Sequence, residues 1–474
     1  MSAAGALAVA VALAGCGSTT YFAGRNLPPS GLLHRVLIAV QNPSAFSRGA
    51  LEFVDSYYDI RYAYDNINKT FSVSGYAGAL PVTIQNMPEE QLGAVYSSGD
   101  GELTFIDYAK EATNGSQAGL NGSSSSVFVS RNQQYAFAAS QQVHVLTAVD
   151  RATNQVASLS LPGIYRVSVN PGGTAALVFV QNSNYLYYTR QLSAAQTISY
   201  SGGPGNWPKA AEDCEPQNAP SWCLFQAQSP DSIDATGNYY GAPLSFDRPV
   251  KAVFSPDGGT AYVLNCGPEC GGTASSVTPL SVGPFLFEVG QQSGKLPKSG
   301  SLTFLPVPGG ASNALVVGST MYVVGQQLQT DGLFTGNLTV VNLLNDTAGS
   351  ATPISDGFPG GVSRMILADD NTLWIGMTKC NNGERFAKGL PYGCLTMYNT
   401  STSTVTMIEP YLGDLTGIAD VEGLHKVYVA QGGQVYIYST RDGAAINNEY
   451  VTVTGTAYDV AYMDGTTDAN NTVY

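Results

Sequence analysis

A unit of short strand, tight turn and second strand recurs eight times along this chain. The clearest copy runs through Lys251-Ala-Val-Phe254, Ser255-Pro-Asp-Gly-Gly259 and Thr260-Ala-Tyr-Val-Leu264. In its central segment, proline presets φ for a turn, aspartate bonds the backbone ahead, and glycine accepts a positive φ. Repetition at this spacing predicts stacked β-sheet modules, and it constrains the architecture more than any single residue does.

Each module is expected to hold four strands, a to d, that alternate apolar and polar residues or are fully apolar. Strand a is expected near Leu80, Ser126, Ile164, Val250, Ser312, Val362, Leu415 and Ala457. Strand b is expected at Leu92–Tyr96, Gln134–Ala139, Ala175–Val180, Ala261–Leu264, Met321–Val324, Leu373–Gly376 and Lys426–Ala430. Strand c is clearest at Glu102–Tyr108, Gln142–Val149, Leu338–Leu343, Cys394–Tyr398 and Gln434–Tyr438.

The two ends of the repeat array complement each other. The array begins with what reads as a strand b, Arg35–Val40, and finishes with an unpaired strand a, Ala457–Met463. Pairing these two segments in one sheet closes a ring and removes exposed sheet edges, which otherwise invite aggregation.

Two segments carry a resemblance to a known family. Ala261-Tyr-Val-Leu-Asn265, which follows the Pro-Asp-Gly turn, and Lys426-Val-Tyr-Val-Ala430 resemble the YVTN-type β-propellers, exported bacterial repeat proteins. The resemblance covers most of residues 33–463 and implies an all-β propeller. The module count predicts eight four-stranded blades, with seven as the alternative. A single domain is expected over residues 33–474, with an insertion at about residues 191–247.

The N-terminus has the pattern of an export signal. Ala3 to Ala14 are apolar and small, too few to span a bilayer but typical of a signal-peptide core. The run ends in Leu13-Ala-Gly-Cys16, which resembles the lipobox of bacterial lipoproteins, although no Lys or Arg precedes it. The resemblance implies a signal peptide at residues 1–15, lipid attachment at Cys16 and a tether at residues 16–32. The chain is therefore expected to be anchored to the cell envelope after export.

The remaining six cysteines fall into three local couples, which favours disulfides in an oxidising compartment. The expected pairs are Cys214 with Cys223, Cys266 with Cys270, and Cys380 with Cys394. Each couple is expected to stiffen one loop. For Cys266 and Cys270, a disulfide is preferred over zinc because no neighbouring histidine completes a metal site.

Charge argues against nucleic acid as a partner. Charged residues make up 12% of the chain, and the formal net charge is −14. Such a surface repels phosphate groups. Hydrophobic residues reach 44%, so the low charge does not indicate disorder.

Long connections are expected on one rim of the ring, where the b–c and d–a connections meet. These are Cys266–Ser276, Gly325–Gly336, Thr378–Gly393 and the insertion Gln191–Asp247. Loops on a rigid scaffold commonly bind ligands. Aromatic residues of the insertion either form a small core or provide a binding face; they are Trp207, Trp222, Phe225, Tyr239 and Tyr240.

No catalytic constellation emerges from the sequence. His144 is expected on a strand surface, and His34 and His425 flank strands b. The chain has no Gly-x-Ser-x-Gly elbow. No cofactor is expected, although calcium stays open at acidic loop residues that match no defined calcium loop; these are Asp231, Asp234, Asp369-Asp370-Asn371 and Asp464 to Asp468.

These observations favour an exported, lipid-anchored propeller that binds a protein or glycan through its loop-rich face without catalysis. One alternative is a lactonase-like hydrolase, which requires charged residues clustered around the central channel. Another is a structural component of a surface layer.

Overall fold

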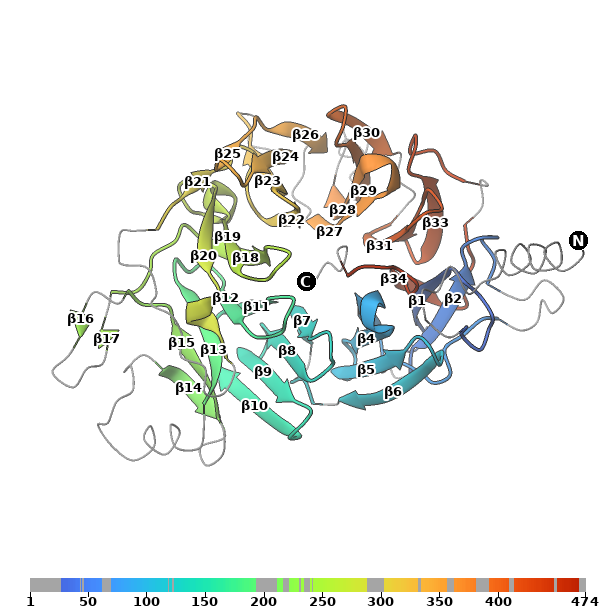
Figure 1. Cartoon of the computed structure of the whole chain (residues 1–474), viewed down its shortest axis with the longest axis horizontal. Coiled ribbons are helices and arrows are strands. Elements are labelled where there is room, and N and C mark those ends of the chain that lie inside the picture. Colours follow the sequence, from blue (N-terminus) through green and yellow to red (C-terminus); the bar gives the residue numbers. More distant parts are fainter. Residues whose placement is uncertain are drawn as a thin grey trace, which may run out of the picture.

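The repeated units form sheets that stand around a common axis as the blades of a β-propeller (Figure 1). The computed structural model describes residues 27–468, except 43, 45–46, 62–69, 118, 122, 193–210, 216–220, 230–231, 234–238, 241, 288–301, 331–333, 356–361, 381–391, 409–412 and 447–449. Within this part of the chain, no helix is long and apolar enough to cross a membrane.

The innermost strands surround the axis, one from each of eight blades. In ring order, these strands a are β34 (Thr456–Tyr462), β3 (Pro81–Met87), β7 (Ser126–Val129), β11 (Ile164–Val169), β18 (Pro249–Phe254), β22 (Asn313–Val317), β27 (Val362–Ala368) and β31 (Leu415–Val421). We number the blades 1 to 8 in this order. Every strand a lies where the repeats predicted it, and the module at Leu80 is a complete blade, so eight is confirmed over seven.

Strands b and c follow outward in each blade. Strands b are β1 (Arg35–Gln41), β4 (Leu92–Ser97), β8 (Tyr135–Ser140), β12 (Ala176–Val180), β19 (Thr260–Asn265), β23 (Thr320–Leu328), β28 (Thr372–Cys380) and β32 (Lys426–Gln431). Strands c are β2 (Ala50–Asp55), β5 (Glu102–Asp107), β9 (Val145–Asp150), β13 (Leu186–Leu192), β20 (Ser276–Ser281), β24 (Phe334–Asn342), β29 (Tyr392–Asn399) and β33 (Gln434–Ser439).

The outer edges vary more than the inner strands. They comprise β6 (Ala112–Gln117), β10 (Gln155–Ser160), β14 (Ala211–Glu215), β15 (Ser221–Gln226), β21 (Leu305–Pro306), β25 (Thr347–Ala348), β26 (Thr352–Ser355) and β30 (Thr404–Ile408). In blades 1 and 8, isolated bridges take the outer position. A hairpin of β16 (Ser232–Ile233) and β17 (Tyr239–Tyr240) and four short 3-10 helices complete the elements: η1 (Pro88–Glu90), η2 (Gly267–Cys270), η3 (Gly283–Phe285) and η4 (Asp369–Asn371).

One hydrophobic cluster lies between each pair of neighbouring blades. Side chains of a strand alternate between its two faces, so one apolar strand serves two clusters. In β1, Val36, Ile38 and Val40 pack toward blade 8, whereas Leu37 and Ala39 pack toward blade 2. This two-sided burial explains why so many strands read as continuous apolar runs.

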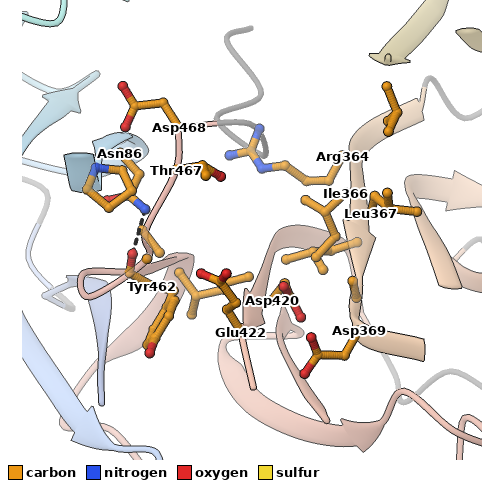
Figure 2. A pocket seen from close by; sticks show the side chains of 18 of the residues that line it. Asn86, Arg364, Ile366, Leu367, Asp369, Asp420, Glu422, Tyr462, Thr467 and Asp468 are labelled. Carbon is orange, nitrogen blue, oxygen red and sulfur yellow. Dashed lines mark hydrogen bonds between the residues drawn. The ribbon is translucent and has the colours of Figure 1, made fainter. Parts of the chain in front are cut away.

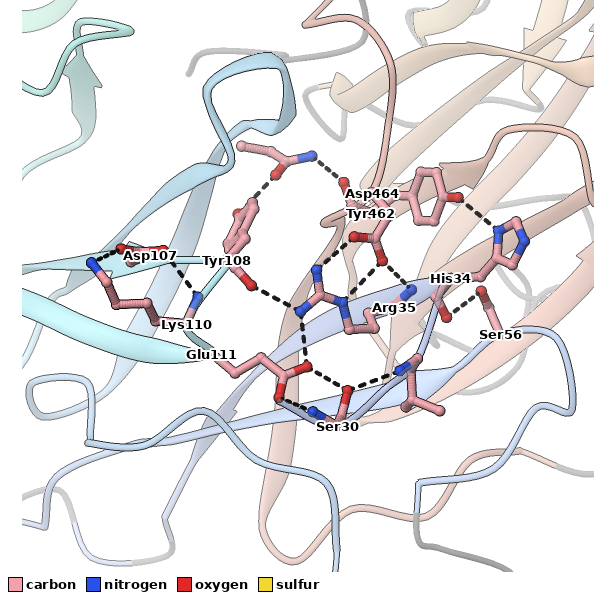
Figure 3. A network of polar contacts seen from close by, with 12 residues as sticks. Ser30, His34, Arg35, Ser56, Asp107, Tyr108, Lys110, Glu111, Tyr462 and Asp464 are labelled. Atoms are coloured by element: carbon pink, nitrogen blue, oxygen red, sulfur yellow. Dashed lines mark hydrogen bonds and ion pairs between the residues drawn. The ribbon is translucent and has the colours of Figure 1, made fainter. Parts of the chain in front are cut away.

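The ring closes as the sequence predicted, because β34 pairs antiparallel with β1. Val36 faces Tyr462 and Leu37 faces Ala461 in this ladder. A buried polar network reinforces the closure (Figure 3). Arg35 contacts Asp464 at 2.6 Å and Glu111 of blade 2 at 2.8 Å, so one guanidinium joins the two ends of the ring to the next blade.

Successive strands run in opposite directions, so the a–b turns lie at one end of the ring and the b–c connections at the other. We call these ends the a–b rim and the b–c rim. Gly423 N and His425 N, at the a–b turn of blade 8, both donate to Asp369 Oδ2 of the blade 7 turn. On the b–c rim, Glu269 accepts a hydrogen bond from Gln326 N of the next blade at 3.0 Å. Contacts of this kind fix neighbouring blades at both rims.

Candidate functional site

Bulges in the innermost strands set which side chains enter the central channel. In six blades, the a–b ladder skips one residue near the start of strand a. A bulge re-aims the residue that follows it. Those residues are Thr83, Arg166, Lys251, Arg364, Gly417 and Asp459. A layer with several charges is thereby created at one height of the channel.

Lys251 is a deeply buried cation of this layer, with 7% of its surface exposed. Its Nζ donates to Asn313 Oδ1 of the next blade at 2.8 Å. Burial, reinforced by repulsion from Arg166 and Arg364, lowers the pKa of Lys251 to about 7. Its proton therefore responds to small changes in charge nearby.

Arg364 and Asp459 form a buried ion pair across the channel wall. Arg364 Nη2 and Asp459 Oδ2 lie 2.7 Å apart, and the same Oδ2 accepts a hydrogen bond from Ile84 N at 2.8 Å. Burial raises the pKa of Asp459, and Arg364 opposes this effect. Gly417 leaves room for the carboxylate, since a Cβ there would lie 2.4 Å from Asp459 Oδ1.

Two adjoining cavities occupy the channel. One, of about 480 Å³, is lined by Lys251, Ser168 and apolar residues of blades 3, 5 and 6. The other, of about 380 Å³, lies beside blades 7, 8 and 1 and is lined by Arg364 and several carboxylates. Figure 2 shows Arg364 extending into this second cavity, with Thr467 facing it. Both volumes fall in the range of small-molecule sites, roughly 300–1,000 Å³.

The segment after β34, residues 464–468, turns into the ring on the a–b rim (Figure 1). We call it the C-terminal segment. Thr466 Oγ1 contacts the Glu422 carboxylate at 2.9 Å, and Asp468 pairs with Arg131 at 2.9 Å. Thr467 and Asp468 line both cavities. The C-terminal segment thus separates the channel from part of the a–b rim.

Two described strands of the predicted insertion, β14 and β15, belong to blade 4. Its strand β15 pairs with β13, and β14 pairs with β15, which makes a five-stranded blade. Trp222 is fully buried between blades 3 and 4, and Phe225 is 2% exposed. Trp222 as a binding-face residue is therefore wrong, because an outer strand in this position needs apolar residues to cover its blade.

The other aromatic candidates are placed less completely. Tyr239 and Tyr240 form strand β17, which pairs with β16 beyond the blade. Trp207 lies outside the described residues. The proposed face therefore rests on the hairpin β16–β17 and on neighbouring connections.

Two of the expected disulfides are confirmed. Cys266 pairs with Cys270 around η2, as expected for a stiffened loop. Cys214 pairs with Cys223, but these residues face each other in the β14–β15 ladder, so this bond joins two strands rather than stiffening a loop. For the third couple, the Cys380 side chain lies outside the described residues, as does Cys16.

The b–c rim carries the longer connections, with one correction. Gly325–Gly336 is not a loop, because β23 and β24 continue pairing to Leu328 and Phe334. This pair forms a projecting hairpin. Beside it, Glu269 of the disulfide loop is half-buried, and the loss of solvent around its carboxyl raises its pKa to about 7 despite the hydrogen bond from Gln326 N. Residues 381–391, in the last expected loop, lie outside the described residues.

None of the three histidines lines either channel cavity. His144 is exposed in a turn with φ of 57°, so its expected place on a strand is wrong; β9 begins one residue later. His34 and His425 precede β1 and β32 as expected. Their Nδ1 atoms contact Tyr462 Oη and Asp370 Oδ2, respectively, both at 2.9 Å.

The acidic residues that the sequence left open for calcium, where the structure describes them, contact other protein groups. Asp370 accepts hydrogen bonds from His425 and Thr440, whereas Asp464 and Asp468 pair with arginines. Among the described residues, no group of three or more His, Cys, Asp or Glu side chains could hold a metal ion. Asp231 and Asp234 lie outside them, and calcium binding stays a prediction.

The sequence missed the channel layer. Lys251, Arg364 and Asp459 lie in blades far apart in the chain, and their shared height depends on bulges. One signal was present, namely a charged residue near the start of several apolar strands a. Strand alternation alone does not show whether such a residue points toward the channel.

Comparisons with known proteins concern the fold alone. Hydrazine synthase from Kuenenia stuttgartiensis matches with a TM-score of 0.45 and 13% identity, over 80% of this chain and 99% of that one. The dihydro-heme d1 dehydrogenase NirN matches with a TM-score of 0.49 and 12% identity, over 93% and 79%. Apo AztD from Citrobacter koseri matches with a TM-score of 0.45 and 10% identity, over 90% and 97%. No protein-family model and no curated protein matches this chain.

Proposed function

We propose that this chain is an exported, lipid-anchored β-propeller that binds a protein or glycan through its b–c rim, as a non-catalytic binding or scaffold module. The observation that supports this most is the concentration of added structure on that rim. The β23–β24 hairpin projects there, and the disulfide loop Cys266–Cys270 lies beside it.

The rim is well suited to present a rigid surface. Glu269 links the disulfide loop to Gln326 at the base of the β23–β24 hairpin. The hairpin β16–β17 extends from blade 4, where Ser229 N donates to Ala242 O at 2.9 Å. Ordered loops lose less conformational entropy when they bind a partner, which strengthens binding.

Export is supported by the disulfides, which persist mainly in oxidising compartments. Acylation at Cys16 would account for attachment to a membrane, because two or more acyl chains hold a protein there stably. We expect metabolic labelling with a fatty-acid analogue to mark the wild-type chain. A Cys16→Ser variant that retains the label would contradict the anchor.

The rim is tested by removing residues 230–241 and joining Ser229 to Ala242 through two glycines. The hydrogen bond between these two residues shows that the cut ends are adjacent, so blade 4 keeps β14 and β15. Binding to isolated envelope glycans and envelope proteins is then compared with wild type. We expect a loss of at least tenfold in affinity.

The matched control alters the opposite rim, where Tyr57 and Tyr58 are 60% and 68% exposed. Replacing both with serine is expected to leave binding unchanged. Unaltered affinity of the hairpin deletion in a folded protein would refute the assigned rim.

A lactone-hydrolysis screen with and without divalent metal tests the absence of catalysis. Turnover that is lost on Lys251→Met or Asp459→Asn would favour the hydrolase alternative.

A further inference from the structure

Lys251 carries a buried ammonium group that has no carboxylate among its hydrogen-bond or ion-pair partners in the described part of the chain. Its hydrogen-bond partner is the neutral side chain of Asn313, at 2.8 Å. None of the ion pairs found among the described residues includes Lys251. A buried cation without a counter-charge is unfavourable, so such a group often indicates a ligand site.

Two further cations lie close to it in the bulge layer. Arg364 is paired with Asp459, whereas Arg166 Nη1 contacts Val250 O at 3.4 Å and its guanidinium lies 5.6 Å from the centre of the Tyr165 ring. The layer therefore contains three cations and one carboxylate. Inside a channel walled by protein, this excess positive charge attracts an anion more strongly than it would in bulk water.

The cavity beside Lys251 is mixed in chemistry. Ser168 Oγ accepts a hydrogen bond from Ala252 N at 3.1 Å, so the hydroxyl proton of Ser168 can be donated to a ligand. Phe128, Leu315 and Val253 provide apolar walls. A ligand that fits this cavity needs an anionic group at one end and an apolar body at the other.

We propose that the axial channel binds a small organic acid, with its carboxylate beside Lys251 and Ser168 and its apolar body against Phe128 and Leu315. The nearby charges of Arg166 and Arg364 add to the attraction for the carboxylate. This site is distinct from the b–c rim, so the two proposals can fail separately. Two turn residues of the a–b rim, Pro171 and Pro256, line this cavity, so the ligand enters from the a–b rim beside the C-terminal segment.

Binding is coupled to protonation. Burial and the neighbouring arginines hold the pKa of Lys251 near 7, and a carboxylate beside it stabilises the charged form. At the other end of the same cavity, Arg131 pairs with both Glu89 and Asp468, so this group carries one net negative charge and does not attract the carboxylate. Between about pH 7 and pH 9, binding is therefore expected to take up protons.

The test measures binding of phenylacetate and benzoate to the purified propeller by calorimetry at pH 6.5. The neutral phenylacetamide and benzamide have the same shape, and inorganic phosphate has the charge without the apolar body. We expect each acid to bind at least tenfold more tightly than its amide and than phosphate. Repeating the titration at pH 8 in buffers of different ionisation enthalpy measures proton uptake.

Lys251→Met and Arg166→Met are each expected to weaken acid binding at least tenfold. Lys110→Met makes the same change of charge at a side chain that is 75% exposed, and it should change nothing. The proposal is overturned if neither acid binds, if acids and amides bind equally, if phosphate binds as tightly, or if folded Lys251→Met and Arg166→Met retain wild-type affinity. Loss of rim binding after deletion of residues 230–241 does not affect this result.

Discussion

Burial moves the pKa values of Lys251 and Glu269 to about 7 from opposite directions. Lysine titrates near 10.5 and glutamate near 4.5 in the absence of such an environment. Each residue therefore makes folding depend on pH, but over different ranges and with opposite slopes.

Lys251→Met is predicted to stabilise the ligand-free protein at low pH. Between about pH 7 and pH 10.5, the unfolded chain holds a proton that folded Lys251 has lost, so wild-type stability rises with pH in this window. The gain from methionine is expected to be roughly 1–3 kcal/mol below pH 7 and to vanish near pH 10.5. Thermal unfolding from pH 5 to pH 10 measures it, with Lys110→Met as control. A uniform loss of stability would contradict the prediction.

Glu269→Gln is predicted to stabilise the protein at high pH. The folded carboxyl keeps its proton between about pH 4.5 and pH 7, whereas the unfolded one does not, so wild-type stability falls as pH rises through this window. Glutamine preserves the acceptor for Gln326 N and removes the charge. A gain of roughly 1–3 kcal/mol is expected above pH 7, and none below pH 4.5.

Denaturant unfolding at pH 4.5 and pH 8 provides the measurement for Glu269→Gln. Glu215→Gln is the matched control, because this side chain is exposed on β14. Equal stability of Glu269→Gln and wild type at pH 8 would show that the carboxyl is hydrated.

At the scale of elements, Arg35 connects three parts of the chain. It lies at the start of β1, and its two carboxylate partners, Asp464 and Glu111, are 3% and 7% exposed in their side chains. Removing one partner of a buried ion pair leaves the charge of the other partner buried and unpaired. Arg35→Met is therefore predicted to destabilise the protein by about 3–5 kcal/mol.

Chemical denaturation measures this effect, and the triple variant Arg35→Met, Asp464→Asn, Glu111→Gln should recover part of the loss. Arg48→Met is the control, since the Arg48 side chain is 56% exposed where it contacts Glu102, and the expected loss is about 0–1 kcal/mol. Similar losses for the two arginine variants would remove the assigned role of the Arg35 network.

Strands were predictable where local pattern decides them. Inner and second strands matched within a few residues because two-sided burial makes them apolar and turn residues mark their ends. The bulges before Arg166, Lys251 and Arg364 could not be predicted, because a bulge depends on the register between two paired strands. Similarly, Trp222 could be assigned to core or surface only once β15 was placed beside β13.

At the scale of the whole molecule, the ring followed from the repeat and from its complementary ends. Seven complete modules and a partial module at each end leave few arrangements without open edges. The candidate site did not follow, because the channel layer combines residues from six blades, and the local sequence does not show that these residues meet. Ring closure therefore underlies both the core and the proposed channel site.

Closure is tested most directly by a disulfide across the β1–β34 ladder. Gln41 and Thr456 are Cα partners in that ladder, and Thr456 is exposed. Facing Cα atoms of antiparallel strands lie about 4.5–5.5 Å apart, a span that a disulfide bridges. Gln41→Cys with Thr456→Cys is predicted to cross-link on mild oxidation, as read by peptide mass, whereas Gln41→Cys with Thr402→Cys on blade 7 is not. A folded protein in which the first pair fails to cross-link, or cross-links no more than the second, would contradict the closed eight-bladed ring.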